Sequence, residues 1–383
     1  MKPSLPPSLL ADRRDFLLAS LATLGFTGRP LHLVAQDKPG SKPQRTADTD
    51  IREALTRAPL SMLFKGSTPA EFRSWHQKFA TKLSQLLGDS SPPTQWTVKE
   101  ESRQVLSDHT RLEFLLQSPG IPPLPIYLLI PSTLRKNSQA PAVVCVHGHG
   151  AFANDAIVGR RDLEGIEADI KRANYDYGLQ FVKRGYVVAA PCMRPFGRRV
   201  DRARYGGNDP CAVNFVRMQS LGQLPITANI RDLRWAIDLL QSRPEVSQDK
   251  IGCAGLSYGG RMTMMVTAVD SRIRVASVSG ALNLLQERMS LRHSCGSQLI
   301  PSLLNYGDYS EIGSLIAPRP CVWEVGSEDK LVVPKWDEIF KGRLRRAYQA
   351  AGVAKNLHFD HFEGGHRWSG RIAFPLFDQV LKS

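Results

Sequence analysis

Hydrophobic and polar positions follow two alternating patterns from Pro141 onward. Short apolar runs of strand length are separated by longer segments whose apolar residues recur at helical spacing, as at Ile230, Leu233 and Ile237. The pattern predicts strands at 142–147, 186–191, 250–256, 273–279, 320–325 and 356–362. It predicts helices at 175–184, 227–242, 259–269, 308–316, 335–351 and 370–381. Because strands and helices alternate, we expect a mostly parallel central sheet with helices on both faces.

The segment before this alternation has a different pattern. Residues 61–95 predict an N-terminal helical extension, because apolar positions within 69–87 are spaced for one helix that Gly88 ends. Three strand-like segments follow, at 96–105, 110–117 and 125–130, and we expect them to pair antiparallel as the leading edge of the sheet.

Two connections are longer than is usual between the elements of an α/β domain. They span residues 193–225 and 281–307. Both follow the carboxyl ends of predicted strands, where open α/β sheets bind ligands. We therefore expect these two insertions to form the wall of a pocket.

A nucleophile motif lies between the strand predicted at 250–256 and the helix that follows it. Gly255, Ser257 and Gly259 form the pattern G-x-S-x-G. Glycines at both ends allow a strand to turn sharply into a helix, which exposes the serine hydroxyl above the sheet. The motif predicts that Ser257 is a catalytic nucleophile.

A serine nucleophile on such a sheet needs an acid and then a histidine, each in a loop after a later strand. Asp329 follows the strand 320–325, and His366 follows the strand 356–362. We therefore predict a triad of Ser257, Asp329 and His366, with His366 as the base. Glu324 and Glu328 remain alternatives for the acid, and His361 remains an alternative for the base.

A glycine-containing loop follows the strand at 142–147, with His147 and His149 alternating with glycines. Acyl transfer needs two backbone N–H groups that point at the developing oxyanion, and glycines let the backbone approach closely. We expect one donor to be the N–H of Tyr258, directly after the nucleophile, and the other to be that of His149.

Together these motifs resemble the α/β-hydrolase superfamily, in its dienelactone-hydrolase and acetyl-xylan-esterase-like branch. The resemblance covers roughly residues 60 to 383 and depends on VHGHG at 146–150, GLSYGGR at 255–261, LIAPRP at 315–320, GSED at 326–329 and FEGGH at 362–366. It implies the α/β-hydrolase fold and ester hydrolysis through an acyl-enzyme, without a metal or other cofactor. Members of the branch differ in substrate, so the resemblance predicts the chemistry better than the substrate.

The first 35 residues predict a twin-arginine export signal. Arg13 and Arg14 precede Phe16 and a short apolar stretch, which is too short to span a bilayer. An ordinary N-terminus with a chance arginine pair is the alternative. We expect an export signal at 1–35 that the twin-arginine machinery recognises, a linker at 36–60 and a hydrolase domain at 61–383. The mature chain is then periplasmic or extracellular, and no later apolar run predicts its insertion into a membrane.

The chain is basic, with a formal net charge of +14. Nucleic acid is not an expected partner, because the sequence has no helix-turn-helix, zinc-finger or RNA-binding signature. Within the first insertion, Arg194, Arg198 and Arg199 are candidates for substrate binding, since guanidinium groups grip carboxylates in a bidentate manner. An acidic sugar ester is then a conceivable substrate. The alternative is a solvated basic loop.

Six cysteines fall into two groups. Those in predicted core strands, such as Cys145, have an ordinary packing role. Cys211 and Cys295 lie in the two insertions, and export would permit a disulfide between them. No cysteine and histidine spacing resembles a zinc site, so we expect no metal.

These observations favour a serine hydrolase that cleaves carboxylic esters of an acetyl-xylan-like carbohydrate or a small molecule. A serine peptidase on the same fold is an alternative, since it would use the same triad. A non-catalytic exported binding protein is a further alternative. The sequence does not distinguish among the acyl and alcohol groups or the possible oligomeric states.

Overall fold

The computed structural model describes residues 45–383 except 202, 204 and 293. The predicted export signal at 1–35 and the first part of the predicted linker lie outside the described residues. The chain divides into two units, and Ala47–Ser383 is the unit that contains the sheet. Across the described ranges, no helix combines the length and the apolar character needed to cross a membrane.

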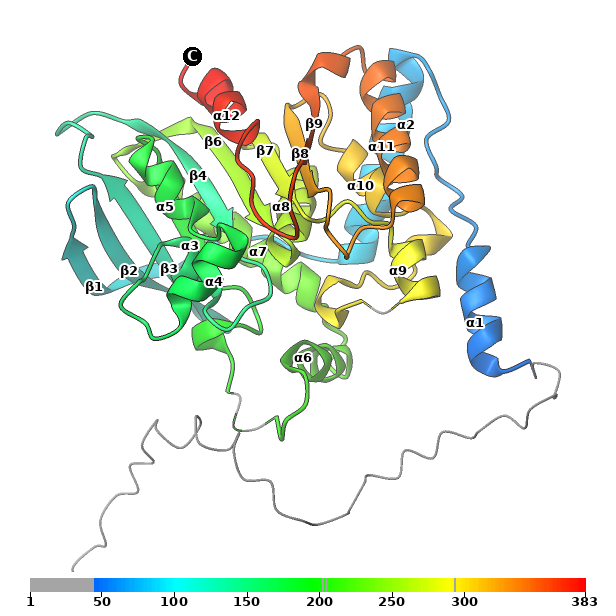
Figure 1. Ribbon diagram of the computed structural model, residues 1–383, viewed down its shortest axis with the longest axis horizontal. Coiled ribbons are helices and arrows are strands. Elements are labelled where there is room, and N and C mark those ends of the chain that lie inside the picture. The colour runs from blue at the N-terminus through cyan, green and yellow to red at the C-terminus, as the bar shows by residue number, and fades with distance from the viewer. Residues whose placement is uncertain (1–44, 202, 204, 293) are drawn as a thin grey trace, which may run out of the picture. The chain divides into compact units, whose positions relative to one another are not determined.

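In this described part, nine strands form one sheet in the order β1-β2-β3-β5-β4-β6-β7-β8-β9 (Figure 1). The strands are β1 (Thr97–Val105), β2 (His109–Ser118), β3 (Ile121–Pro131), β4 (Ala140–Val146), β5 (Val187–Pro191), β6 (Val246–Leu256), β7 (Ile273–Ser279), β8 (Cys321–Gly326) and β9 (Leu357–Phe362). The neighbouring pairs β1–β2, β2–β3 and β3–β5 are antiparallel. The pairs that follow across the sheet, from β5–β4 to β8–β9, are all parallel. The prediction of a mostly parallel sheet with an antiparallel leading edge is confirmed.

Helices connect these strands and precede them. They are α1 (Ala47–Thr56), α2 (Pro69–Leu87), α3 (Ala153–Ile157), α4 (Ile166–Ala173), α5 (Tyr177–Lys183), α6 (Pro210–Gln219), α7 (Pro225–Ser242), α8 (Tyr258–Val269), α9 (Leu285–Leu291), α10 (Tyr309–Ser314), α11 (Pro334–Ala350) and α12 (Ala373–Leu381). Helix α2 begins with a capping box in which Thr68 and Glu71 exchange hydrogen bonds, as its local sequence favours.

The sheet is buried on both faces. On β4, Val144 and Val146 pack into one hydrophobic core with α2, α7, α8 and α11, whereas Val143 and Cys145 pack into a second core with α5 and α12. Successive side chains of a strand point to opposite faces, so an uninterrupted apolar strand such as β4 requires a helical layer on each side. This arrangement confirms the α/β-hydrolase fold class predicted from the sequence.

Residues 47–56, which lie within the predicted linker at 36–60, form the helix α1. None of its residues is buried, so packing into the core does not stabilise this helix. Its last turn is instead capped from α9, where the Gln286 side chain donates hydrogen bonds to the carbonyls of Leu55 and Thr56 at 3.1 and 2.9 Å. A contact between residues 230 positions apart therefore helps to hold this end of α1.

Candidate active site

Ser257 occupies the sharp turn between β6 and α8. Its backbone is left-handed, with φ of +63° and ψ of −122°, and its N–H donates to the Ser279 carbonyl at 2.8 Å. The first turn of α8 packs directly onto β4, because a Cβ at Gly259 would lie 1.9 Å from the Val146 carbonyl oxygen. Only glycine fits there, which explains why the serine conformation depends on the glycine two residues later.

Asp329 and His366 are hydrogen-bonded to each other. The distance from His366 Nδ1 to Asp329 Oδ2 is 2.7 Å, and the Asp329 carboxylate is buried. The other oxygen of Asp329 accepts the Leu331 N–H at 2.9 Å. The loops that carry the two residues are also joined by backbone, since the Glu328 N–H donates to the Gly364 carbonyl at 2.8 Å. This pair therefore has a fixed orientation.

The His366 ring lies beside the serine turn. A Cβ at Gly280 would lie 2.6 Å from His366 Cε1, and Gly280 directly follows Ser279, which accepts the Ser257 N–H. His366 Nε2 is buried and has no hydrogen-bond partner among the described residues. The structure thus brings the acid and the histidine together next to the nucleophile turn, without a hydrogen bond from Ser257 to Nε2. Such bonds often tighten only when a substrate is bound.

The alternative acids and base have other positions. Glu324 is buried and accepts the N–H groups of Ser369 and Gly370 at 3.3 and 2.9 Å, and burial raises its pKa to about 7. His361 is exposed on β9 and borders a different cavity. Because Asp329 forms the contact with His366, the geometry favours Asp329 over Glu324 as the acid.

The loop after β4 is held next to Ser257. A Cβ at Gly148 would lie 3.0 Å from Ser257 Cβ, and the Gly148 N–H donates to the Tyr175 hydroxyl at 2.5 Å. His147 Nε2 accepts the Met193 N–H at 2.9 Å, so Nδ1 carries the proton that faces the Gly148 carbonyl at 2.8 Å. Burial lowers the pKa of His147 to about 4, which keeps this ring neutral. His147 therefore positions the loop.

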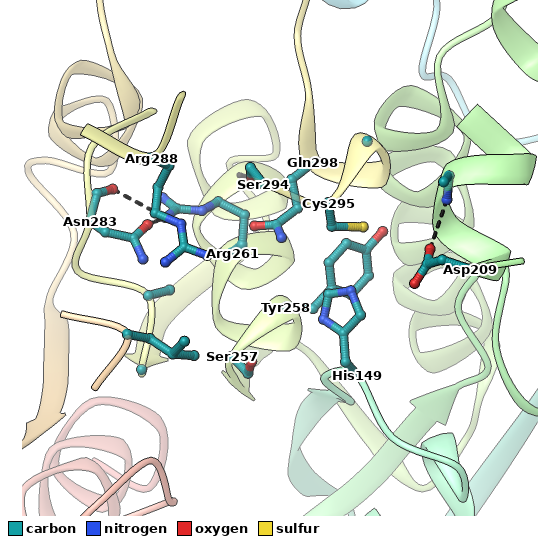
Figure 2. Close-up of a pocket in the computed structure, with 15 residues that line it drawn as sticks. His149, Asp209, Ser257, Tyr258, Arg261, Asn283, Arg288, Ser294, Cys295 and Gln298 are labelled. Carbon is teal, nitrogen blue, oxygen red and sulfur yellow. Dashed lines mark hydrogen bonds between the residues drawn. The ribbon is translucent and has the colours of Figure 1, made fainter. Parts of the chain in front are cut away.

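A cavity of about 460 Å³ opens at Ser257 and Tyr258 (Figure 2). The first insertion contributes Asp209, and the second insertion contributes Asn283 and Cys295 to its wall. Both insertions thus take part in the lining, as expected from their positions after the strands. His149 also borders the cavity, and its ring packs edge-on against Tyr258 at 5.1 Å between centroids. The oxyanion roles of the Tyr258 and His149 N–H groups stay a prediction.

The three arginines predicted for substrate binding have protein partners instead. Arg194 and Arg199 pair with the buried Asp232, at 3.0 and 2.6 Å. Arg198 pairs with Glu101 on β1. The wall of the cavity described above does not include these arginines. Their ion pairs favour the alternative that the basic loop is structural.

Two other arginines, which the sequence did not single out, border the cavity. Arg261 on α8 is buried, lies over the Tyr309 ring at 3.7 Å and donates to the Asn283 carbonyl at 3.2 Å. Burial lowers its pKa to about 10. Arg288 on α9 has a buried Nη1 with no hydrogen-bond partner among the described residues. Arg261 belongs to the GLSYGGR motif, so its place one turn after the nucleophile was a signal in the sequence.

The profile of the Abhydrolase family matches residues 51–370. The chain belongs to this family. A curated relative, "Putative hydrolase YtaP" of Bacillus subtilis (strain 168), is 29% identical over 292 residues, which cover 74% of this chain and 92% of the relative.

Solved structures show the same fold. A "putative acetyl xylan esterase" from Bacteroides fragilis NCTC 9343 superposes with a TM-score of 0.70 at 20% identity and covers 83% of each chain. A CE15 glucuronoyl esterase from Teredinibacter turnerae T7901 superposes with a TM-score of 0.58 at 17% identity and covers 90% of this chain and 93% of that one. The predicted resemblance to the α/β-hydrolase superfamily is therefore confirmed.

Proposed function

We propose that this hydrolase cleaves carboxylic esters through Ser257, His366 and Asp329, with a carbohydrate or small-molecule ester as substrate. The observation that carries the proposal is the 2.7 Å contact between His366 and Asp329 beside a serine held at positive φ. Strained backbone at a residue that borders a cavity is typical of a functional position. Family membership and the shared fold of two esterases support the same class of reaction.

In the proposed cycle, Ser257 Oγ bonds to the ester carbonyl carbon while its proton passes to His366 Nε2. Asp329 holds the ring through Nδ1 and stabilises the imidazolium. The intermediate then collapses, the C–O bond to the alcohol breaks, and the alcohol leaves with the proton from Nε2. Water next gives a proton to Nε2 as it attacks the acyl-enzyme. The bond between the acyl carbon and Ser257 Oγ then breaks, Nε2 returns the proton to Oγ, and the carboxylic acid is released.

The cavity supports a polar substrate. Its volume of about 460 Å³ is that of a small-molecule site. Arg261 and Arg288 place two guanidinium groups in the same wall, and Figure 2 shows both on the side of Asn283. Guanidinium donors bind carboxylate and hydroxyl oxygens, so a sugar ester with an acidic or hydroxyl-rich group fits this wall.

The test compares wild type with Ser257→Ala on p-nitrophenyl acetate, acetylated xylan and a methyl glucuronate ester. We expect Ser257→Ala to lose a factor of about 10⁴ or more in kcat, because the nucleophile is removed. Ser294→Ala is the matched control, since it removes a hydroxyl from the same cavity and leaves the serine turn intact. It should keep activity within a few-fold of wild type.

Other outcomes would overturn the proposal. Cleavage of aminoacyl anilides in preference to every ester would indicate the peptidase alternative. If neither wild type nor Ser257→Ala exceeds the uncatalysed rate, and a fluorophosphonate does not label Ser257, the protein is non-catalytic.

A further inference from the structure

Three side chains that can bind metals converge at one side of the cavity. They are His149 in the loop after β4, Cys211 in the first turn of α6 and Cys295 next to a short 3-10 helix at Gly296–Gln298. Their potential ligand atoms all lie within 4.8 Å of one another. Cys211 and Cys295 are free thiols, so the disulfide expected between them is not formed in this structure.

The spacing of these atoms matches a tetrahedral metal site. Cys211 Sγ lies 3.6 Å from His149 Nε2. With Zn–S of about 2.3 Å and Zn–N of about 2.0–2.1 Å, the edge of a tetrahedron between sulfur and nitrogen is also about 3.6 Å. A disulfide needs only two sulfur atoms, and it does not explain why an imidazole nitrogen lies at this distance.

The surroundings hold the imidazole in place. The His149 ring packs edge-on against Phe196, at 5.2 Å between centroids, and against Tyr258 at 5.1 Å. Cys211 is buried and Cys295 is half-buried. Figure 2 shows Cys295 and His149 on the same side of the cavity as the Tyr258 ring. A site that includes two thiolates, an imidazole and aromatic walls suits a borderline-soft cation such as Zn²⁺.

We propose that His149, Cys211 and Cys295 form a binding site for Zn²⁺ or a cation of the same class, at the edge of the Ser257 cavity. Binding would displace one proton from each thiol, and the two protons pass to solvent. Three protein ligands leave a fourth position for water or a substrate oxygen. The ion would join both insertions to the loop after β4. Ester hydrolysis as proposed above requires no metal, so this site goes beyond that function.

The test uses the full reduced chain, freed of metal by a chelator and titrated with Zn²⁺ against a colorimetric competitor. We expect one equivalent to bind. Cys211→Ser and Cys295→Ser should each weaken the affinity by well over about 100-fold, a larger loss than the 10–100-fold typical of outer-shell changes. Cys192→Ser is the matched control, because the Cys192 thiol donates to the Phe196 carbonyl and is not one of the three ligands, so its loss should leave Zn²⁺ affinity unchanged.

Cobalt substitution provides a second readout that does not depend on the variants. Co²⁺ bound to wild type should show thiolate charge-transfer absorption and the intense visible bands of a tetrahedral complex. Failure of reduced wild type to bind Zn²⁺ more tightly than Cys295→Ser would overturn the proposal, as would a Co²⁺ spectrum without thiolate bands. Formation of a Cys211–Cys295 disulfide in the presence of Zn²⁺ would also overturn it. The Ser257→Ala experiment needs no metal, so the two proposals can fail separately.

Discussion

Gly280 provides a direct test of whether the position of His366 controls the reaction. In Gly280→Ala, the new Cβ would meet His366 Cε1 at 2.6 Å and Nδ1 at 3.0 Å. Ordinary carbon contacts begin at about 3.5 Å, so the ring must move by about 1 Å or the backbone must yield. A displacement of about 1 Å of a catalytic group can cost about 100-fold in rate. We therefore expect kcat to fall by about that factor.

A matched control separates this effect from backbone strain. Gly280 has φ of +61°, where alanine costs about 1–2 kcal/mol of stability. Gly352 has φ of +75°, and no described atom lies within 4 Å of the place that an alanine methyl group would take, so Gly352→Ala carries the strain without the contact. Both variants should lower Tm, Gly280→Ala by at least as much as Gly352→Ala because of its added contact, whereas only Gly280→Ala should lose activity on p-nitrophenyl acetate. Wild-type kcat in Gly280→Ala would refute the assignment of His366 as the base.

Two further predictions concern the acids near the site. Asp329→Asn should lower kcat by about 10⁴-fold with little change in Tm, because the amide stabilises the wrong tautomer of His366. Glu328→Gln is its control, and equal losses of kcat in both variants would contradict the assignment of Asp329 as the acid. Burial raises the pKa of Glu324 from 4.5 to about 7. Between these pH values the folded chain still binds the proton that the unfolded chain has released, so stability is lost as pH rises from about 4.5 to 7. Between pH 5 and pH 8, the free energy of unfolding in urea should decrease by about 3 kcal/mol more in wild type than in Glu324→Gln. The same pH dependence of this free energy in both chains would show that Glu324 is not its cause.

Much of the site was predictable because its signals are local. The turn at Ser257 depends on glycines two residues away on each side, and a chain segment of this pattern between a strand and a helix has few other conformations. Asp329 and His366 each follow a strand, and parallel strands bring their carboxyl ends to one edge. Helix α6 was not predicted, although local signals for its start are present: Asp209 caps it by accepting the Ala212 N–H at 2.8 Å, and Pro210 occupies its first turn.

Other features depend on partners that lie far away in the chain. The start of α9 is capped by Asp308, which accepts the N–H groups of Leu285 and Gln286 at 2.6 and 3.0 Å. Nothing near Leu285 in the sequence indicates that cap. Likewise, Arg194 and Arg199 were predicted to bind substrate, but in the structure both form ion pairs with Asp232, which lies more than thirty residues away in the chain.

The sequence by itself determined the main alternation of strands and helices from β4 onward, the sharp turn at Ser257 and the loops that carry Asp329 and His366, because periodicity and glycine placement act over a few residues. Only the tertiary structure decided which charges are paired and which side chains share a cavity. It brought Arg261 beside Arg288, and it brought His149, Cys211 and Cys295 within 4.8 Å of one another. Such contacts depend on how the two insertions fold back over the sheet, and side-chain packing between distant segments has no period that a sequence displays.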